Sequence, residues 1–229
     1  LNSIDLNNPN LKIIGNNSFG YCLSLTHIII QNSPYLYEIS ENIFLDSSHI
    51  QDIDISNLIN LKKLPKPLYK TLNGSLKKVT LSSLPDISNI PDECFYEFAV
   101  LGKFNIKNCI SLNKIGRESF ANCTELSNIN LNDLSSLIYI DTSAFANSGI
   151  LKLDLSRNKD LSYIGSSAFN TCSQLVSIDL SGLTKLIKIP DKCFANDTSL
   201  NKIILTNCIS LNIIDDLAFS NTTDLSHFP

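Results

Sequence analysis

The sequence is short of several residue types, and each shortage makes one class of protein less plausible. It contains no Met and no Trp, and only 17% of its residues are charged, with a formal net charge of −4. A general nucleic-acid binder would carry a basic excess, so we expect no nucleic-acid partner. The low charged fraction, beside 43% apolar residues, also argues against long disordered stretches.

Long apolar runs and catalytic motifs are missing as well. No run approaches the roughly 18 apolar residues that span a bilayer, so we expect no membrane insertion by this segment. The sequence has no P-loop, no dinucleotide-binding glycine pattern and no nucleophile elbow. Its histidines, His27, His49 and His227, have no partner at ligand or triad spacing. We therefore expect no catalytic residue, no metal site and no cofactor.

Aromatic residues recur along the whole chain at a nearly constant interval. Successive spacings are 25, 25, 26, 25, 25, 24, 25 and 25 residues. The positions are Phe19, Phe44, Tyr69, Phe95, Phe120, Phe145, Phe169, Phe194 and Phe219. A fixed period of this length indicates a solenoid of stacked units, and we expect the rings to form an interior spine.

Each unit of 24–26 residues repeats L-x-x-I-x-L-x-x-(L/C)-x-x-L-x-x-I-x-x-x-x-F-x-x-(C/S)-x-x. Its first part alternates at period two, as in Ile178 and Leu180, which predicts a short strand with one buried face. The L-x-x-I pair, such as Leu186 and Ile189, is expected to point inward on the far side. The segment around the Phe predicts a short helical turn. One unit cannot bury its apolar side alone, so the units must stack.

We expect a single solenoid of about nine units over residues 1–229. Neither end carries a polar cap, which predicts that this is a fragment of a longer parent chain. The third unit (50–75) is irregular, because it has 26 residues, contains Pro65 and Pro67, and replaces the spine Phe with Tyr69. Prolines resist helix, so the outer segment of this unit is expected to be an extended or open loop.

The string I-G-S-S-A-F-N-T-C at 164–172, followed by the strand pattern at 175–180, resembles the BspA-type leucine-rich repeat family. Residues 14–22 and 115–123 are similar, and the resemblance covers the whole chain. It implies an α/β repeat solenoid, a leucine-rich repeat arc with parallel strands on the concave face and short helical or irregular segments on the convex face. It also implies a cell-surface or secreted protein of bacteria or protists, where such repeats are associated with adhesion to host or matrix proteins.

Seven cysteines occupy repeat positions that suit small buried residues. Cys109 and Cys208, for example, take a slot that other units fill with Leu. Equivalent cysteines never fall in adjacent units, so a ladder of disulfides is not available at the Cα separation of about 7 Å that a bridge allows. We expect free buried thiols, with one or two bridges or a functional thiol as the alternatives.

Six lysines and no acidic residue lie between Asp54 and Asp86, over the irregular unit. These residues are Lys62, Lys63, Lys66, Lys70, Lys77 and Lys78. One interpretation is a solvated surface without a binding role, and the other is a docking patch for an acidic partner. Lys78 also aligns with Lys103 on the exposed face of the strands, which is polar and carries no aromatic residue. This face is either an ordinary solvated sheet or a weak polar binding surface, and in the second case Lys103, Asp154 and Asp179 are further candidates for partner binding.

Asp154 and Asp179 take the same exposed strand position in adjacent units. Like charges directly opposite each other are destabilising. Lys152 is one candidate to relieve the repulsion, and a weakly held cation is another.

The sequence favours a non-catalytic binding or adhesion module with a protein partner. The alternative is an intracellular or structural scaffold, for which a cytoplasmic location would apply. A third interpretation is an enzyme or its regulatory part, but any catalysis would then lie in a domain outside these residues.

Overall fold

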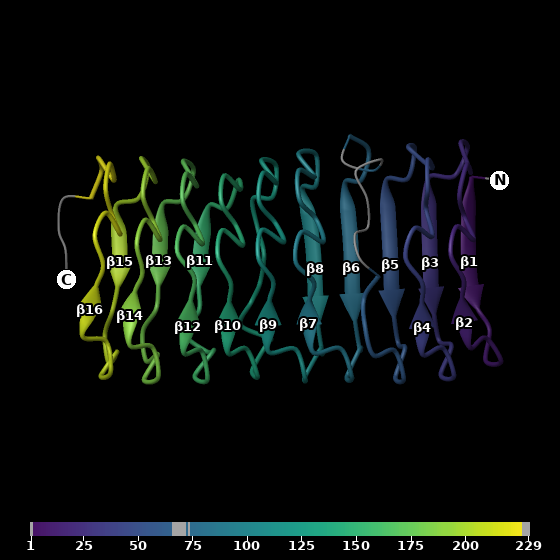
Figure 1. The fold of residues 1–229 in the computed structure, drawn as a ribbon, viewed down its shortest axis with the longest axis horizontal. Coiled ribbons are helices and arrows are strands. Elements are labelled where there is room, and N and C mark those ends of the chain that lie inside the picture. The colour runs from purple at the N-terminus through teal and green to yellow at the C-terminus, as the bar shows by residue number, and fades with distance from the viewer. Residues whose placement is uncertain (1, 66–71, 73, 226–229) are drawn as a thin grey trace.

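The computed structural model describes residues 2–65, 72 and 74–225. Its units stack in a row, with the N-terminus at one end and the C-terminus at the other (Figure 1). Strands form two sets, and every recorded strand pair is parallel, in agreement with the sequence prediction. In the described units, a third stretch around the spine Phe carries turns instead of strand.

We call the first set the long-strand side. Its strands are β1 (Ser3–Asn7), β3 (His27–Gln31), β5 (Asp52–Ser56), β6 (Lys78–Ser82), β8 (Lys103–Lys107), β11 (Lys152–Asp154), β13 (Ser177–Asp179) and β15 (Lys202–Ile204). They form a five-stranded sheet from β1 to β8 and a three-stranded sheet from β11 to β15. The intervening unit contributes a single bridge, between Phe104 and Ile129.

We call the second set the short-strand side, because each of its strands has 2 residues. They are β2 (Ile13–Ile14), β4 (Glu38–Ile39), β7 (Asn89–Ile90), β9 (Lys114–Ile115), β10 (Tyr139–Ile140), β12 (Tyr163–Ile164), β14 (Lys188–Ile189) and β16 (Ile213–Ile214). This side is interrupted between β4 and β7 and between β12 and β14.

The core lies between the two sides and contains the predicted Phe spine. Ile28 and Ile30 point into it from β3, and Ile39 points into it from β4. The rings of successive units stack, for example Phe120 on Phe145 at 5.1 Å between centroids and 1° between planes. The predicted spine is therefore confirmed, except that Tyr69 lies outside the described residues.

The predicted helical turns are wrong, because the described residues contain no helix. Around the spine Phe, backbone N–H groups donate to the next unit rather than to a residue four positions earlier. Glu93 N donates to Arg117 O at 2.8 Å, and Phe95 N donates to Ser119 O at 2.8 Å. Buried N–H groups need a partner, and the next unit supplies one in the same way for the N–H groups of Phe120, Phe145, Phe169 and Phe194.

Left-handed residues on both sides of each spine Phe make this ladder possible. Positive φ angles recur two residues before the Phe, as at Glu118 (φ 53°), and two residues after it, as at Asn122 (φ 62°). Such a residue cannot continue a right-handed helix, and outside glycine it costs about 1–2 kcal/mol. The inter-unit hydrogen bonds offset this cost, which a single unit in isolation could not do.

We expected nine units, each with one strand on the long-strand side, and this number of strands is not confirmed. The long-strand side has about eight turns of strand, because residues 126–149 contribute only the isolated bridge. In the irregular third unit, residues 61–65 form no strand, whereas the equivalent residues of the neighbouring units form β4 and β7. The outer segment of this unit, which we expected to be an extended or open loop, lies mostly outside the described residues.

Candidate functional site

The predicted basic cluster does not form one surface. Lys62 and Lys63 are exposed on the short-strand side, in the unit between β4 and β7. Lys77 is exposed directly before β6, and Lys78 is the first residue of that strand. The described lysines of the cluster therefore divide between the two sides of the solenoid, although they are close in sequence.

Three further residues belong to this prediction. Lys66 and Lys70 lie outside the described residues. Lys103 is the first residue of β8 and pairs in register with Lys78. Two like charges are thus neighbours on the long-strand side, and Asp52 of β5 is the register partner of Lys78 on its other flank.

Prolines explain the interruption of the short-strand side next to Lys62. In a regular unit, the residue after the short strand donates its N–H to the preceding unit, as Ser40 N does to Ile14 O at 2.8 Å. Pro65 and Pro91 occupy this position in the next two units and have no N–H to donate. The ladder therefore stops after β4 and resumes only at β7.

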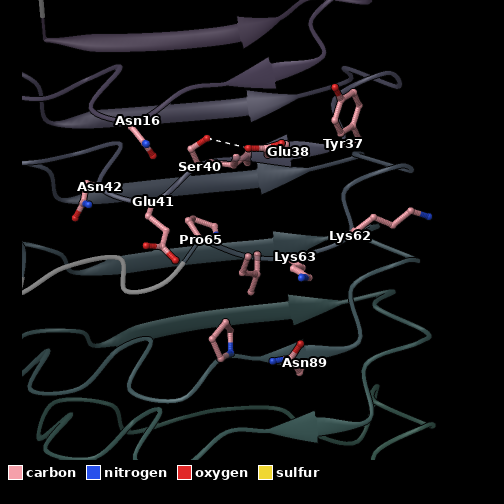
Figure 2. A pocket seen from close by; sticks show the side chains of 13 residues that line it. Asn16, Tyr37, Glu38, Ser40, Glu41, Asn42, Lys62, Lys63, Pro65 and Asn89 are labelled. Atoms are coloured by element: carbon pink, nitrogen blue, oxygen red, sulfur yellow. Dashed lines mark hydrogen bonds between the residues drawn. The ribbon is translucent and has the colours of Figure 1, made fainter.

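A cleft of about 790 Å³ opens at this interruption (Figure 2), and we call it the Lys62 cleft. Its described walls are Asn16, Tyr37, Glu38, Ile39, Ser40, Glu41, Asn42, Lys62, Lys63, Leu64, Pro65, Asn89 and Pro91. Charges of both signs, amides and one aromatic ring thus meet where the sheet is broken. A mixed lining of this kind can orient a polar ligand by hydrogen bonds and charge.

The charged side chains of the Lys62 cleft are only partly engaged. Lys62 forms an ion pair with Asp86. Glu38 Oε1 accepts a hydrogen bond from Ser40 Oγ at 3.1 Å, drawn as a dashed line in Figure 2. No ion pair is recorded for Lys63 within the described residues. Its ammonium group therefore remains available to an incoming acidic group.

Sequence reasoning missed a tyrosine pair beside this cleft. Tyr35 and Tyr37, with 59% and 46% exposure, line a second hollow of about 390 Å³ with Lys12, Asn60 and Lys62. Tyr37 and Lys62 belong to both hollows, so the two are continuous. Exposed Tyr is enriched at interface hot spots. The signal was present, since Tyr37 falls between the buried residues Leu36 and Ile39 of the L-x-x-I segment, where an exposed ring has no role in the core.

Asp154 and Asp179 are register partners, as predicted from their repeat position. Each carboxylate turns back to its own chain instead of facing the other. Asp154 Oδ1 accepts from Ser156 N at 2.9 Å, and Asp179 Oδ1 accepts from Ser181 N at 2.8 Å. Desolvation raises the pKa of Asp154, but the hydrogen bonds from Ser156 outweigh it and leave this pKa below its ordinary value. The role of Asp154 and Asp179 in partner binding stays a prediction.

Two kinds of site do not emerge from the part of the chain that the structure describes. There is no group of three or more His, Cys, Asp or Glu side chains able to hold a metal ion among residues 2–65, 72 and 74–225. Within the same residues, no helix is long and apolar enough to cross a membrane. The like charges of Asp154 and Asp179 are accommodated by their turns, as described above.

His27 lies between a hydroxyl and a carboxylate, which superficially resembles a catalytic triad. Its Nδ1 is 2.8 Å from Thr26 Oγ1, and its Nε2 is 3.1 Å from Asp52 Oδ2. The Thr26 hydroxyl donates to Asn2 O at 2.8 Å, so its oxygen can only accept from the ring. The Thr26 hydroxyl therefore does not donate to the imidazole, as a nucleophile activated by a general base must.

All seven cysteines are free thiols, and five of them are buried as predicted. Cys123 and Cys172 each lie with Sγ 3.1 Å from a backbone carbonyl of the preceding unit, that of Phe95 and Phe145 respectively. Burial raises the pKa of Cys172 to about 12. Such thiols stay protonated at neutral pH and are poor nucleophiles, so their role here is packing.

A buried carboxyl group, Asp197, stands in the same column of the repeat as Cys172. It is 0% exposed, and neither of its carboxyl oxygens has a hydrogen-bond partner among the described residues. Burial raises the pKa of Asp197 to about 8. Ser47, in the equivalent position, donates from Oγ to Phe19 O at 2.5 Å. With this pKa, folding favours the neutral acid, and ionisation of a buried carboxyl group without a hydrogen-bond partner is costly, so Asp197 is a weak point of the core.

Comparison with known proteins gives one family match. The BspA type leucine rich repeat region matches residues 1–112 and 88–226, in 6 copies. A search of curated protein sequences finds no match.

Solved structures of bacterial repeat proteins are also similar. A leucine-rich repeat protein of Bacteroides ovatus is 19% identical over 94% of this chain and 69% of its own, with a TM-score of 0.44. The pneumococcal vaccine antigen PcpA is 20% identical over 93% of this chain and 56% of its own, with a TM-score of 0.43. A leucine rich cell surface protein of Faecalibacterium prausnitzii is 18% identical over 99% and 72%, with a TM-score of 0.30.

Proposed function

The chain belongs to the BspA-type leucine-rich repeat family, and from this premise we propose that it is a non-catalytic binding module of a cell-surface or secreted protein. The family is one of protein-binding repeats, which supports a protein partner. Export and adhesion rest on the resemblance of the repeats to surface proteins of bacteria and protists.

The Lys62 cleft is the surface we assign to the partner. The observation that carries this assignment is the cleft itself, which opens where prolines interrupt the short-strand side and where Lys63 forms no ion pair with any residue that the structure describes. The exposed rings of Tyr35 and Tyr37 adjoin it. Amphipathic rings beside a charged cleft are the composition that protein interfaces favour at their centres.

Charge reversal in the cleft tests this assignment. The chain is immobilised and exposed to a panel of purified host-surface and matrix proteins, and binding is measured by biolayer interferometry. For a partner that binds, Lys63→Glu combined with Tyr37→Ala should weaken the affinity by about 30-fold or more, because a charge pair and an aromatic contact are both lost.

Lys188 provides the positional control, because it occupies the same repeat position as Lys63 in a distant unit, although it is paired there with Asp215 at 2.7 Å. Lys188→Glu should leave the affinity within about twofold, since exposed charges away from the interface contribute little to binding. A partner whose affinity is unchanged by the Lys63 and Tyr37 substitutions would show that binding lies elsewhere on the solenoid.

Location is tested separately, by sequencing the full parent transcript. An export signal ahead of this segment, with an anchor or sorting segment behind it, would support the surface assignment. A parent chain without an export signal would contradict it and favour the scaffold interpretation, in which the solenoid serves an assembly inside the cell.

A further inference from the structure

The long-strand side has its own hollow, at the place where its sheet is interrupted. The five-stranded sheet ends at β8, and the next unit is joined to it only by the bridge between Phe104 and Ile129. A hollow of about 520 Å³ lies at this break. Its polar lining is Lys103, Asn105, Lys107, Asn128, Asn130 and Asp133. We call it the Lys103 hollow.

The spacing of its two lysines follows from strand geometry. Lys103, Asn105 and Lys107 are the outward residues of β8, while Phe104 and Ile106 are buried. Lys107 lies four steps along the strand from Lys103, so the two Cα atoms are about 13 Å apart along one face. The hollow is therefore a trough with a cation at each end and amide groups between them.

Most donors in the Lys103 hollow are uncommitted. No ion pair is recorded for Lys103 or Lys107, and no hydrogen bond is recorded for the Asn128 side chain, among the described residues. Asn105 Nδ2 donates to Thr80 Oγ1 at 3.4 Å, which leaves its second N–H unused. The trough thus presents two ammonium groups and unpaired amide N–H groups to solvent.

One carboxylate opposes this positive character. Asp133 accepts a hydrogen bond from Asn130 Nδ2 at 3.4 Å, and Asn130 Oδ1 accepts from Asn132 N at 3.0 Å. The Asn130 side chain is therefore held in its own turn and contributes less to a ligand. Two cations against one anion leave the hollow positive, in a chain whose net charge is −4.

The chemistry of the trough selects the kind of ligand. It exposes no aromatic ring, and its lining has neither Tyr, Trp nor Arg, so it lacks the residues on which protein interfaces depend. Nucleic acids bind through larger basic surfaces and through stacking on aromatic rings, and neither is present here. Lysine ammonium groups and Asn amides suit a hydrated ligand that carries both oxyanions and hydroxyls.

We propose that the Lys103 hollow binds an acidic polysaccharide, with Lys103 and Lys107 contacting carboxylate or sulfate groups and Asn105 and Asn128 contacting hydroxyls. This site lies on the opposite side of the solenoid from the Lys62 cleft, so it does not depend on the protein partner assigned there. A chain with both sites could attach to a protein and to a polysaccharide coat independently.

Binding is measured by isothermal titration calorimetry with the whole 229-residue chain. The probes are alginate and heparin as acidic polysaccharides, with dextran, poly-L-glutamate and single-stranded DNA as comparisons. At least one acidic polysaccharide should bind, with an affinity that falls as salt rises, and dextran should not bind. Lys103→Gln with Lys107→Gln should weaken that binding by about tenfold or more, because both charge contacts are lost.

Matched variants separate a built site from general charge. Lys152 and Lys202 begin β11 and β15 and take the same strand position as Lys103, away from the hollow. Their double substitution to Gln should change the affinity by less than about twofold. Asp133→Asn should strengthen binding by about two- to fivefold, because it removes the repelling carboxylate.

Three results would overturn the proposal. One is the absence of binding by both acidic polysaccharides. Another is an equal loss of affinity in the control and hollow variants, since that would leave only nonspecific charge. The third is tighter binding of poly-L-glutamate or DNA than of either polysaccharide, which would assign the hollow to a different class of macromolecule.

Discussion

The long-strand side changes between its two halves. On this side β1, β3, β5, β6 and β8 have 5 residues each, while β11, β13 and β15 have 3. In the first half, Asp5 accepts hydrogen bonds from Gln31 Nε2 of the neighbouring strand at 3.3 and 3.4 Å. In the second half, Asp154 accepts from Ser156 N, two residues ahead. An outward carboxylate thus either accepts a hydrogen bond from the neighbouring strand or stabilises a turn in its own chain.

Two similar segments show that both the buried residue and the neighbouring strands differ between these outcomes. Asp54-Ile55-Ser56 remains in strand β5, whereas Asp154-Leu155-Ser156 leaves strand β11 after its first residue. The buried residue differs, since Ile is β-branched and stiff in the extended conformation and Leu is not. The neighbours differ too, because β5 is paired on both flanks and β11 only on one.

The spine shows the opposite trend. From Phe95 to Phe219 the rings stack without interruption, with Phe145 on Phe169 at 5.3 Å and 3°. In the first half, Phe19 lies on Phe44 at 6.1 Å and 25°, and Phe19 is only partly buried. The loosest ring pair thus lies in units with 5-residue strands, although Phe95 and Phe120 stack regularly in units that also have 5-residue strands.

The largest predicted effect concerns the spine. Phe145→Ala removes a ring that is 0% exposed and stacked on both faces, and should lower the free energy of unfolding by about 3–5 kcal/mol. Phe19→Ala should cost about half as much or less, because Phe19 is partly buried and stacked on one recorded ring. Urea unfolding followed by circular dichroism measures both. Equal losses would mean that the two ends of the spine contribute alike.

The next effect concerns Asp197, in the regular part of the spine. Asp197→Ser restores a hydroxyl that can donate to the preceding unit, as Ser47 does to Phe19 O. It should raise the free energy of unfolding at pH 7.5 by about 1–3 kcal/mol, because a buried unpaired carboxyl is removed. Thermal and urea unfolding measure the gain. Ser47→Asp is the reciprocal variant in the first half and should destabilise the protein.

Asp197 also predicts the pH dependence of stability. Its pKa rises from 3.8 to about 8 on folding, so the folded state favours the protonated acid. The loss of unfolding free energy that comes from the ionisation of Asp197 is absent below pH 3.8. It grows as the pH rises toward 8 and is constant above about pH 8. Wild type should therefore lose stability relative to Asp197→Ser between these limits. Parallel curves for the two proteins would contradict the assignment.

A smaller effect should follow from the turn-forming aspartates. Asp154→Thr removes the acceptor for Ser156 N. It also places a threonine at the strand position that Thr80 occupies in β6. Stability should fall by about 0.5–1.5 kcal/mol, the net contribution of one hydrogen bond. Hydrogen exchange at the Ser156 amide should become faster. Slower exchange would instead mean that β11 extends as far as the strands of the first half.

The candidate sites were only partly predictable. The lysines between Asp54 and Asp86 were visible as a charge run, and the prolines marked the irregular unit. The division of that run between two sides was not visible, because it depends on how many residues pass between one side of the solenoid and the other. Tyr37 and the Lys103 hollow were missed for a related reason, since both arise from interruptions in sheets that span several units.

The sequence by itself determined the solenoid, its Phe spine and the alternation of its strands. These features follow from a period near 25 residues and from apolar positions that only stacking can bury. Only the tertiary structure decided the rest. The segment around each Phe became an inter-unit ladder with left-handed residues, such as Asn122 with φ 62°, instead of a helix. A single unit gives no sign of this, because the acceptors of its N–H groups belong to the next unit.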